Sequence, residues 1–153
     1  MTNPIPHAPA GANTTHHVVG CTHDYKVIPE QSSGAFTIFE ITVPPRCGPP
    51  LHVHEQDAEW MYVLEGTLTF ENPQGRIVAG PGDSCLLPAG IAHGFYNPTE
   101  RPARAIVVAS PGAQAFRFFQ EIDQRLHGAV EVPVVVDVAA KHGITMCPPS
   151  MAA

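Results

Sequence analysis

The sequence predicts a single all-β domain followed by a helical C-terminal segment. Its 153 residues are about the length of one domain. Seventeen prolines and thirteen glycines, with charged residues at only 14%, favour many short strands and tight turns over long helices. A helical hydrophobic period appears only after Pro111 and Gly112, which indicates a change from strands to helix at that point.

The chain begins with a polar segment, residues 1–17, that is rich in Pro, Ala, Asn, Thr and His. This composition predicts a flexible arm and not a packed element. We therefore expect His7, His16 and His17 to be tail residues and not metal ligands.

Residues 18–110 alternate between short apolar runs and turn sequences, which predicts the β-domain. Pro29 and Pro44 end two of these runs, because proline cannot donate a hydrogen bond to a strand ladder. Two strands within residues 59–70 are expected to meet at a tight turn near Gly66. The other expected strands cover residues 25–28, 35–43, 52–54, 76–79, 83–87, 92–96 and 103–109.

Residues 111–153 are expected to form a helical extension that packs against the β-domain. Apolar residues recur there at helical spacing, and Gly128 stands where the helix is expected to end. We expect Phe116 and Phe119 to serve core packing and not to form a platform for a ligand. The apolar positions of this helix are Ala115, Phe116, Phe119, Ile122 and Leu126.

A second, shorter helix is expected over residues 137–143. Asp137 would be its N-cap, because an aspartate side chain can accept a hydrogen bond from a backbone N–H of the first turn. Gly143 would end it, since glycine adopts the left-handed conformation that follows many helices.

The most distinctive chemical feature is a set of three imidazoles and one carboxylate. His52 and His54 are two residues apart in a strand, so both point to the same face of it. Glu59 opens the next strand, and a later strand can bring His93 back beside the histidine pair. This ligand mix suits a divalent transition metal. A site of this kind usually keeps one position open for water or substrate, which makes it catalytic and not structural.

These residues lie in two runs that resemble the two signature motifs of the cupin superfamily. The first run has the form G…HxHx4Ex6G and the second the form Gx5PxGx2Hx3N, in the same order as in that family. The resemblance covers roughly residues 34 to 110, although the stretch between Gly48 and His52 is shorter than usual. The matching residues are Gly48, His52, His54, Glu59 and Gly66, then Gly82, Pro88, Gly90, His93 and Asn97.

The resemblance implies a single cupin barrel, that is, a double-stranded β-helix or jelly roll. It also implies that His52, His54, Glu59 and His93 are the metal ligands. One divalent ion per chain is expected. Iron, nickel, cobalt, manganese and zinc all accept this ligand set, so its identity stays open.

The sequence around the motifs is similar to that of small bacterial quercetinase-like cupins. That similarity implies a metal-dependent dioxygenase that acts with O2 on a small aromatic or enolic substrate, flavonol-like or polyketide-like. It also implies that Glu59 accepts a proton besides binding the metal. Trp60 departs from the pattern, and strand alternation places it on the face opposite Glu59, outside the barrel. The similar segments are residues 49–54, 62–66, 80–83, 102–104 and 118–121.

Two other functions remain open. The first is a cyclase or isomerase, of the kind found among cupins of aromatic polyketide pathways, in which zinc polarises carbonyls and no oxygen is used. The second is a barrel that binds a small molecule without converting it. The fold alone does not decide among these functions.

Charge and hydropathy exclude several classes of partner. A net charge of −6 with no basic cluster argues against nucleic acid, and no apolar run approaches the roughly 20 residues of a membrane span. Residues 1–19 lack a signal-peptide pattern, which predicts a cytoplasmic protein with reduced cysteines. We expect a homodimer in which part of residues 15–28 adds a strand to its own or its partner's sheet edge.

Overall fold

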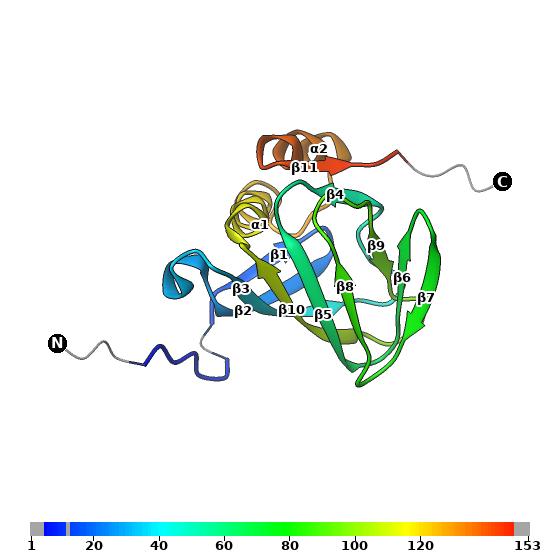
Figure 1. Ribbon diagram of the computed structural model, residues 1–153, viewed down its shortest axis with the longest axis horizontal. Coiled ribbons are helices and arrows are strands. Elements are labelled where there is room, and N and C mark those ends of the chain that lie inside the picture. The colour runs from blue at the N-terminus through cyan, green and yellow to red at the C-terminus, as the bar shows by residue number, and fades with distance from the viewer. Residues whose placement is uncertain (1–4, 12, 149–153) are drawn as a thin grey trace.

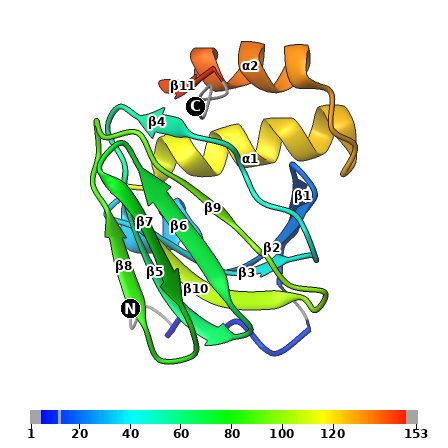
Figure 2. The same cartoon turned by 90° about the vertical axis from the view of Figure 1, so that its right-hand side faces the viewer.

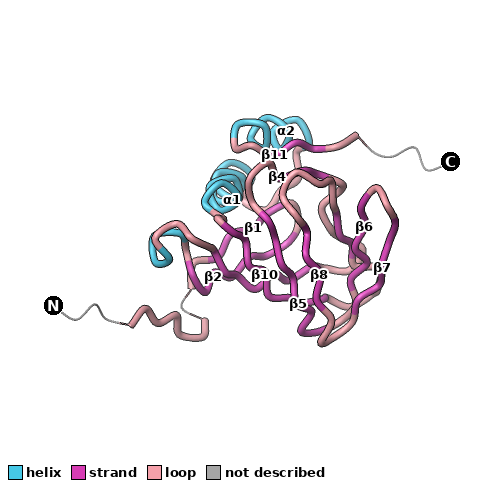
Figure 3. Tube along the Cα trace, viewed as in Figure 1, coloured by secondary structure: helices cyan, strands magenta, loops and turns pink. Residues whose placement is uncertain are grey.

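The strands form a β-barrel, and both long helices lie together at one end of it (Figures 1 and 2). The computed structural model describes residues 5–11 and 13–148. Most of the regular structure within these ranges is β-strand, and Figure 3 shows the two helices gathered on one side. The predicted all-β jelly-roll fold with C-terminal helices is confirmed.

One wall of the barrel is an antiparallel six-stranded sheet in the order β1-β2-β3-β10-β5-β8. Buried and partly exposed residues alternate along β3 and β10, so one face of the sheet fills the core. The strands are β1 (Thr15–Val18), β2 (Cys21–Val27), β3 (Thr37–Val43), β5 (Ala58–Glu65), β8 (Ser84–Leu87) and β10 (Ala103–Ser110).

Two smaller sheets, in the orders β7-β6-β9 and β11-β4, complete the barrel. Their strands are β4 (His52–His54), β6 (Leu68–Asn72), β7 (Gly75–Ala79), β9 (Gly94–Tyr96) and β11 (Ile144–Met146). The core side chains between the walls are almost wholly excluded from solvent, and removing their apolar surface from water stabilises the fold. They include Phe39, Met61, Val63, Leu68 and Val107.

Helix α1 (Ala113–Leu126) packs along β1, and α2 (Val132–Lys141) packs along β11 and α1. All five apolar positions predicted for the first helix are buried. Its first turn is capped from a distant part of the chain. Asp57, in the loop before β5, accepts hydrogen bonds from the backbone N–H groups of Gly112 at 2.9 Å and Ala115 at 2.8 Å. Neither helix combines the length and the apolar character needed to cross a membrane.

The prediction for the second helix was wrong at its start. The helix begins at Val132, and Asp137 is an exposed residue within it and not its N-cap. Pro133 lies in the first turn, where its fixed φ favours a helix and its missing N–H costs nothing. Burial of Val135 and Val138 outweighs the preference of β-branched residues for strands.

The prediction of a flexible arm over residues 1–17 was wrong at its C-terminal end, because β1 begins at Thr15. Residues 1–4 and 12 of the predicted arm lie outside the described residues. His16 is buried in β1 and is not a tail residue, whereas His17 is exposed. The His16 ring packs on Tyr25 and Phe116, with centroids 4.9 and 5.6 Å away. β1 and β2 form a hairpin, and β1 is the edge strand of the chain's own six-stranded sheet. This is one of the two arrangements expected for residues 15–28, the other being a strand added to the partner's sheet.

Candidate metal centre

Four buried side chains from three parts of the barrel converge at one place. His52 and His54 lie on β4, Glu59 lies at the start of β5, and His93 directly precedes β9. One donor atom from each residue lies within 4.8 Å of the donor atoms of the other three. The structure thus brings together all four residues that the motifs predict as ligands.

Backbone pairing explains why these residues meet. His52 and His93 form an isolated antiparallel bridge, in which each N–H donates to the other's carbonyl at 2.9 Å. On the other edge of β4, Ile144 and Met146 of β11 pair with His54 and His52. Both edges of this three-residue strand are therefore held, which fixes the two histidines on one inward face.

Gly48 allows the segment leading to β4 to lie against β9. A Cβ atom at this position would come within 2.1 Å of the carbonyl oxygen of Phe95, which is closer than any side chain can approach. The neighbouring backbone is bonded to the end of β9, since the N–H of Asn97 donates to the carbonyl of Cys47 at 2.8 Å. This glycine of the first motif thus joins it to the second.

Hydrogen bonds orient two of the imidazoles. Nδ1 of His52 lies 2.9 Å from the carbonyl oxygen of Pro50, and Nδ1 of His93 lies 3.0 Å from that of Ile91. A carbonyl can only accept, so in each ring Nδ1 carries a proton, which leaves Nε2 as the atom available to a metal. Nε2 of His52 faces Nε2 of His54 at 3.1 Å. Nε2 of His93 is buried and has no hydrogen-bond partner within the described chain.

Electrostatics keep two of the ligands in the forms that bind a cation. Burial raises the pKa of Glu59, but the imidazoles of His54, His93 and His52 outweigh it and lower that pKa to about 2. An oxygen of Glu59, Oε2, lies 3.5 Å from Nε2 of His93 and 3.8 Å from Nε2 of His54. Burial and the two other imidazoles lower the pKa of His52 to about 4. At neutral pH Glu59 is therefore ionised and His52 is neutral, as metal coordination requires.

This donor set fits a divalent transition metal. Three imidazoles and one carboxylate are ligands that zinc, iron, nickel and cobalt accept. A cation at their centre would satisfy the unpartnered Nε2 of His93 and the facing Nε2 atoms of His52 and His54. Two of the rings already donate through Nδ1 to backbone carbonyls, the usual support for metal-bound histidine.

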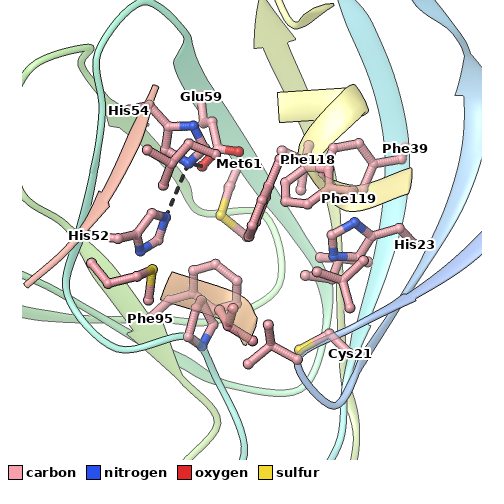
Figure 4. A pocket seen from close by; sticks show the side chains of 18 residues that line it. Cys21, His23, Phe39, His52, His54, Glu59, Met61, Phe95, Phe118 and Phe119 are labelled. Carbon is pink, nitrogen blue, oxygen red and sulfur yellow. Dashed lines mark hydrogen bonds and ion pairs between the residues drawn. The ribbon is translucent and has the colours of Figure 1, made fainter. Parts of the chain in front are cut away.

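An apolar cavity opens beside the four donors and extends toward β2 and α1 (Figure 4). Its volume is about 60 Å³, which is room for a few water molecules. His52, His54 and Glu59 lie at one side and His23 at the other, as Figure 4 shows. The walls between them are apolar and include Phe39, Met61, Phe95, Val107, Phe118 and Phe119.

The cavity contains residues that the sequence analysis did not assign to it. Phe119 was expected to serve core packing only, yet it lines the cavity, while Phe116 packs on Tyr25 and His16. His23 was not assigned to any site. The alternation of Cys21, His23 and Tyr25 with polar residues could have placed His23 on the inner face of its strand. Trp60 lies outside the barrel as predicted, 38% exposed and stacked on Tyr62.

Comparisons with known proteins agree with this structure. A family model described as Cupin domain matches residues 39–109. Germin-like protein 3-7 of Oryza sativa subsp. japonica is 36% identical over an alignment of 64 positions, which covers 39% of this chain and 28% of that protein. The chain thus spans less than a third of the length of this curated relative.

Solved structures share the fold over most of the chain. The polyketide cyclase RemF from Streptomyces resistomycificus has a TM-score of 0.61 and 25% identity, covering 71% of this chain and 80% of RemF. An RmlC-like cupin from Shewanella frigidimarina has a TM-score of 0.63 and 18% identity, covering 76% of this chain and 99% of that protein. The family model and these structures together support the cupin superfamily.

Proposed function

We propose that this chain, which has a cupin-type fold, is a metal-dependent enzyme that dioxygenates a small aromatic or enolic substrate. One observation carries the proposal: three histidines and a glutamate converge, buried, at one side of an apolar cavity. A metal held by His52, His54, Glu59 and His93 would supply Lewis acidity that lowers the pKa of a substrate hydroxyl. The apolar walls would hold the ring of the substrate and exclude water.

The chemistry of the cavity lining favours dioxygenation over reactions with several proton transfers. Besides the ligands His52, His54 and Glu59, the described lining residues that can exchange a proton are Cys21 and His23. Burial raises the pKa of the Cys21 thiol, which keeps it protonated and unreactive. A reaction that needs one deprotonation, followed by addition of both atoms of O2, suits so sparse a set of polar groups.

Glu59 is the residue placed to take that proton. Its carboxylate is buried at the metal end of the cavity and stays ionised, since its pKa is lowered to about 2. So low a pKa makes it a weak base, and it can accept a proton only from a hydroxyl that has itself become strongly acidic. The role of Glu59 as proton acceptor would therefore depend on its binding the same metal that makes the hydroxyl acidic.

Oxygen consumption tests the proposal. The metal-free protein would be loaded in turn with Fe(II), Ni(II), Co(II), Mn(II) and Zn(II) and supplied with flavonols and smaller enols and catechols. We expect oxygen uptake with at least one of these metals, and a product that carries both oxygen atoms when 18O2 is supplied. Metal-loaded protein that binds these compounds but consumes no oxygen with any of the metals would contradict it.

A cyclase is the second candidate, and the likeness to RemF favours it. In that case His52, His54, Glu59 and His93 would hold zinc, which would polarise a carbonyl, and Glu59 would move protons during ring closure. The two candidates differ in their need for oxygen. Conversion of a poly-β-ketone by the zinc form under anaerobic conditions would support the cyclase and exclude the dioxygenase for that substrate.

A further inference from the structure

A buried histidine, His23, forms part of the cavity wall away from the metal centre. It lies on β2, is 4% exposed and lines the cavity. In Figure 4 its ring stands across the cavity from His52. It does not belong to the group of four converging donors, so metal binding does not explain its presence.

Aromatic contacts hold the His23 ring in one orientation. It stacks on Phe39 with centroids 4.5 Å apart and an interplanar angle of 20°. Phe119 meets it edge-on, also at 4.5 Å, with an angle of 88°. A phenylalanine would make the same contacts at this position, so packing alone does not require the two ring nitrogens.

One nitrogen of His23, Nδ1, is energetically unfavourable where it stands. Nδ1 is buried and finds no hydrogen-bond partner among the residues that the structure describes. An unpaired buried polar group of this kind destabilises a fold, because it has lost its hydrogen bonds to water. Burial outweighs the attraction of Glu59 and lowers the pKa of His23 to about 3, so the ring is neutral at physiological pH. A neutral imidazole offers one N–H donor and one lone pair.

We propose that His23 binds an oxygen atom at the end of the substrate remote from the metal centre. The inference rests on the proposed function and names its substrate class more closely. The substrate would be a small flat molecule with an ionisable hydroxyl at the metal end and a neutral hydroxyl or carbonyl at the other. A carboxylate would fit poorly at the far end, because a neutral ring does not compensate for burying a negative charge.

Buried water is the competing explanation, and the structure offers a control for it. Nδ1 of His16 and the hydroxyl of Tyr25 are also buried without partners in the described chain. His16 is the cross-strand partner of His23, but it does not line the cavity. Water that satisfied all three atoms would leave His23 no special role toward a ligand. His16 is thus a matched buried histidine outside the cavity.

The test compares two catechols of nearly equal shape, 4-(hydroxymethyl)catechol and 4-ethylcatechol, which differ by one remote oxygen. Their affinities would be measured by calorimetry for zinc-loaded wild type, His23→Phe and His16→Phe, since zinc does not oxidise them. We expect the affinity ratio of hydroxymethyl to ethyl compound to fall about five- to tenfold in His23→Phe, the effect of one hydrogen bond. The ratio should not change in His16→Phe.

The outcomes separate this inference from the proposed function. An unchanged ratio in His23→Phe, with both catechols bound, would overturn the role of His23 and leave the metal-dependent function intact. Failure of both catechols to bind zinc-loaded wild type would contradict the proposed function, and the His23 inference with it.

A measurement on wild type keeps the inference testable if His23→Phe does not fold. The 15N resonances of the His23 ring should shift on addition of the hydroxymethyl compound. They should stay in place with the ethyl compound, which has no oxygen to offer. Equal shifts with both compounds, or none with either, would overturn the inference.

Discussion

His52 and His93 exchange both of their backbone hydrogen bonds, each 2.9 Å long, although they belong to two separate motifs. Their ring centroids lie 4.6 Å apart. The main chain itself therefore sets the distance between a ligand of the first motif and the ligand of the second. We expect a site held in this way to keep its shape without metal, which would lower the conformational cost of binding.

Replacing Glu59 by Gln should separate metal binding from turnover. Glutamine keeps the shape and one weak oxygen ligand but loses the negative charge and the ability to accept a proton. We expect weaker but measurable metal binding, and activity reduced by about 100-fold or more, the usual contribution of general base catalysis. Metal content by elemental analysis and oxygen uptake would be measured on the same samples. Full activity in Glu59→Gln would rule out its role as proton acceptor.

Acid should destabilise the metal-free protein, and His23 should account for part of the effect. Its pKa is about 3 in the folded protein and about 6.5 in the unfolded chain. Between these values the unfolded chain binds a proton that the folded protein does not, so the free energy of unfolding falls as pH falls. The lowered pKa values of His52 and His16 act in the same direction.

His23→Phe should therefore reduce the slope of stability against pH. One proton corresponds to about 1.4 kcal/mol per pH unit below pH 6.5. Urea unfolding of metal-free wild type and His23→Phe at pH 7.5, 6 and 5 would measure it. His17→Phe is the control, because His17 is exposed. Equal slopes for wild type and His23→Phe would show that His23 takes up its proton in the folded state as well.

Removing the side chain of Asp57 should destabilise the packing of α1. Its buried carboxylate accepts the backbone hydrogen bonds of Gly112 and Ala115 in the first turn of that helix. We expect Asp57→Ala to lower the free energy of unfolding by about 3 kcal/mol, since each bond involves a charged acceptor. Asp137→Ala, at an exposed position of α2, should change it by less than about 0.5 kcal/mol. Urea unfolding that gave the two variants equal stability would contradict the capping role.

We expect a homodimer in solution. The outward face of the six-stranded sheet carries exposed apolar side chains close together, the kind of surface that pairs with another copy. These are Trp60, Tyr62 and Leu64 on β5 and Leu86 on β8. Light scattering should give twice the chain mass of 16.4 kDa, and Leu86→Lys should shift the protein toward monomer. A monomer mass for wild type at micromolar concentration would refute this expectation.

The sequence predicted those parts of the structure that depend on local pattern. The pair His52 and His54 shares a face because strand residues alternate, and both are buried on β4. Trp60 lies outside for the same reason, next to a buried Glu59. Gly82 and Gly90 of the second motif adopt positive φ angles in turns where no distant atom approaches them, which is local information, and most of the expected strands appear near their expected positions.

The parts that the sequence did not predict depend on contacts between distant segments. β11 has only three residues, and it is a strand because it pairs with β4, which lies far earlier in the chain. The polar sequence Thr-His-His-Val of β1 predicts a flexible arm, whereas His16 is buried there because it packs on Tyr25 and on Phe116 of α1. The inward position of His23 likewise matters only because α1 brings Phe119 against it. Local propensity does not contain such information.

The metal content of the protein and its ligand variants tests the central claim most directly. Wild type, His52→Ala, His54→Ala, His93→Ala and the control His17→Ala would be purified without added metal, loaded with zinc or cobalt, desalted and analysed for elements. We expect one ion per chain in wild type and His17→Ala. The metal affinity of His52→Ala, His54→Ala and His93→Ala should fall by more than about 100-fold. Loss of a residue that only hydrogen-bonds to a metal ligand already lowers metal affinity by up to about 100-fold. Stoichiometric metal in any two of the three ligand variants, or none in wild type, would contradict the four-residue site.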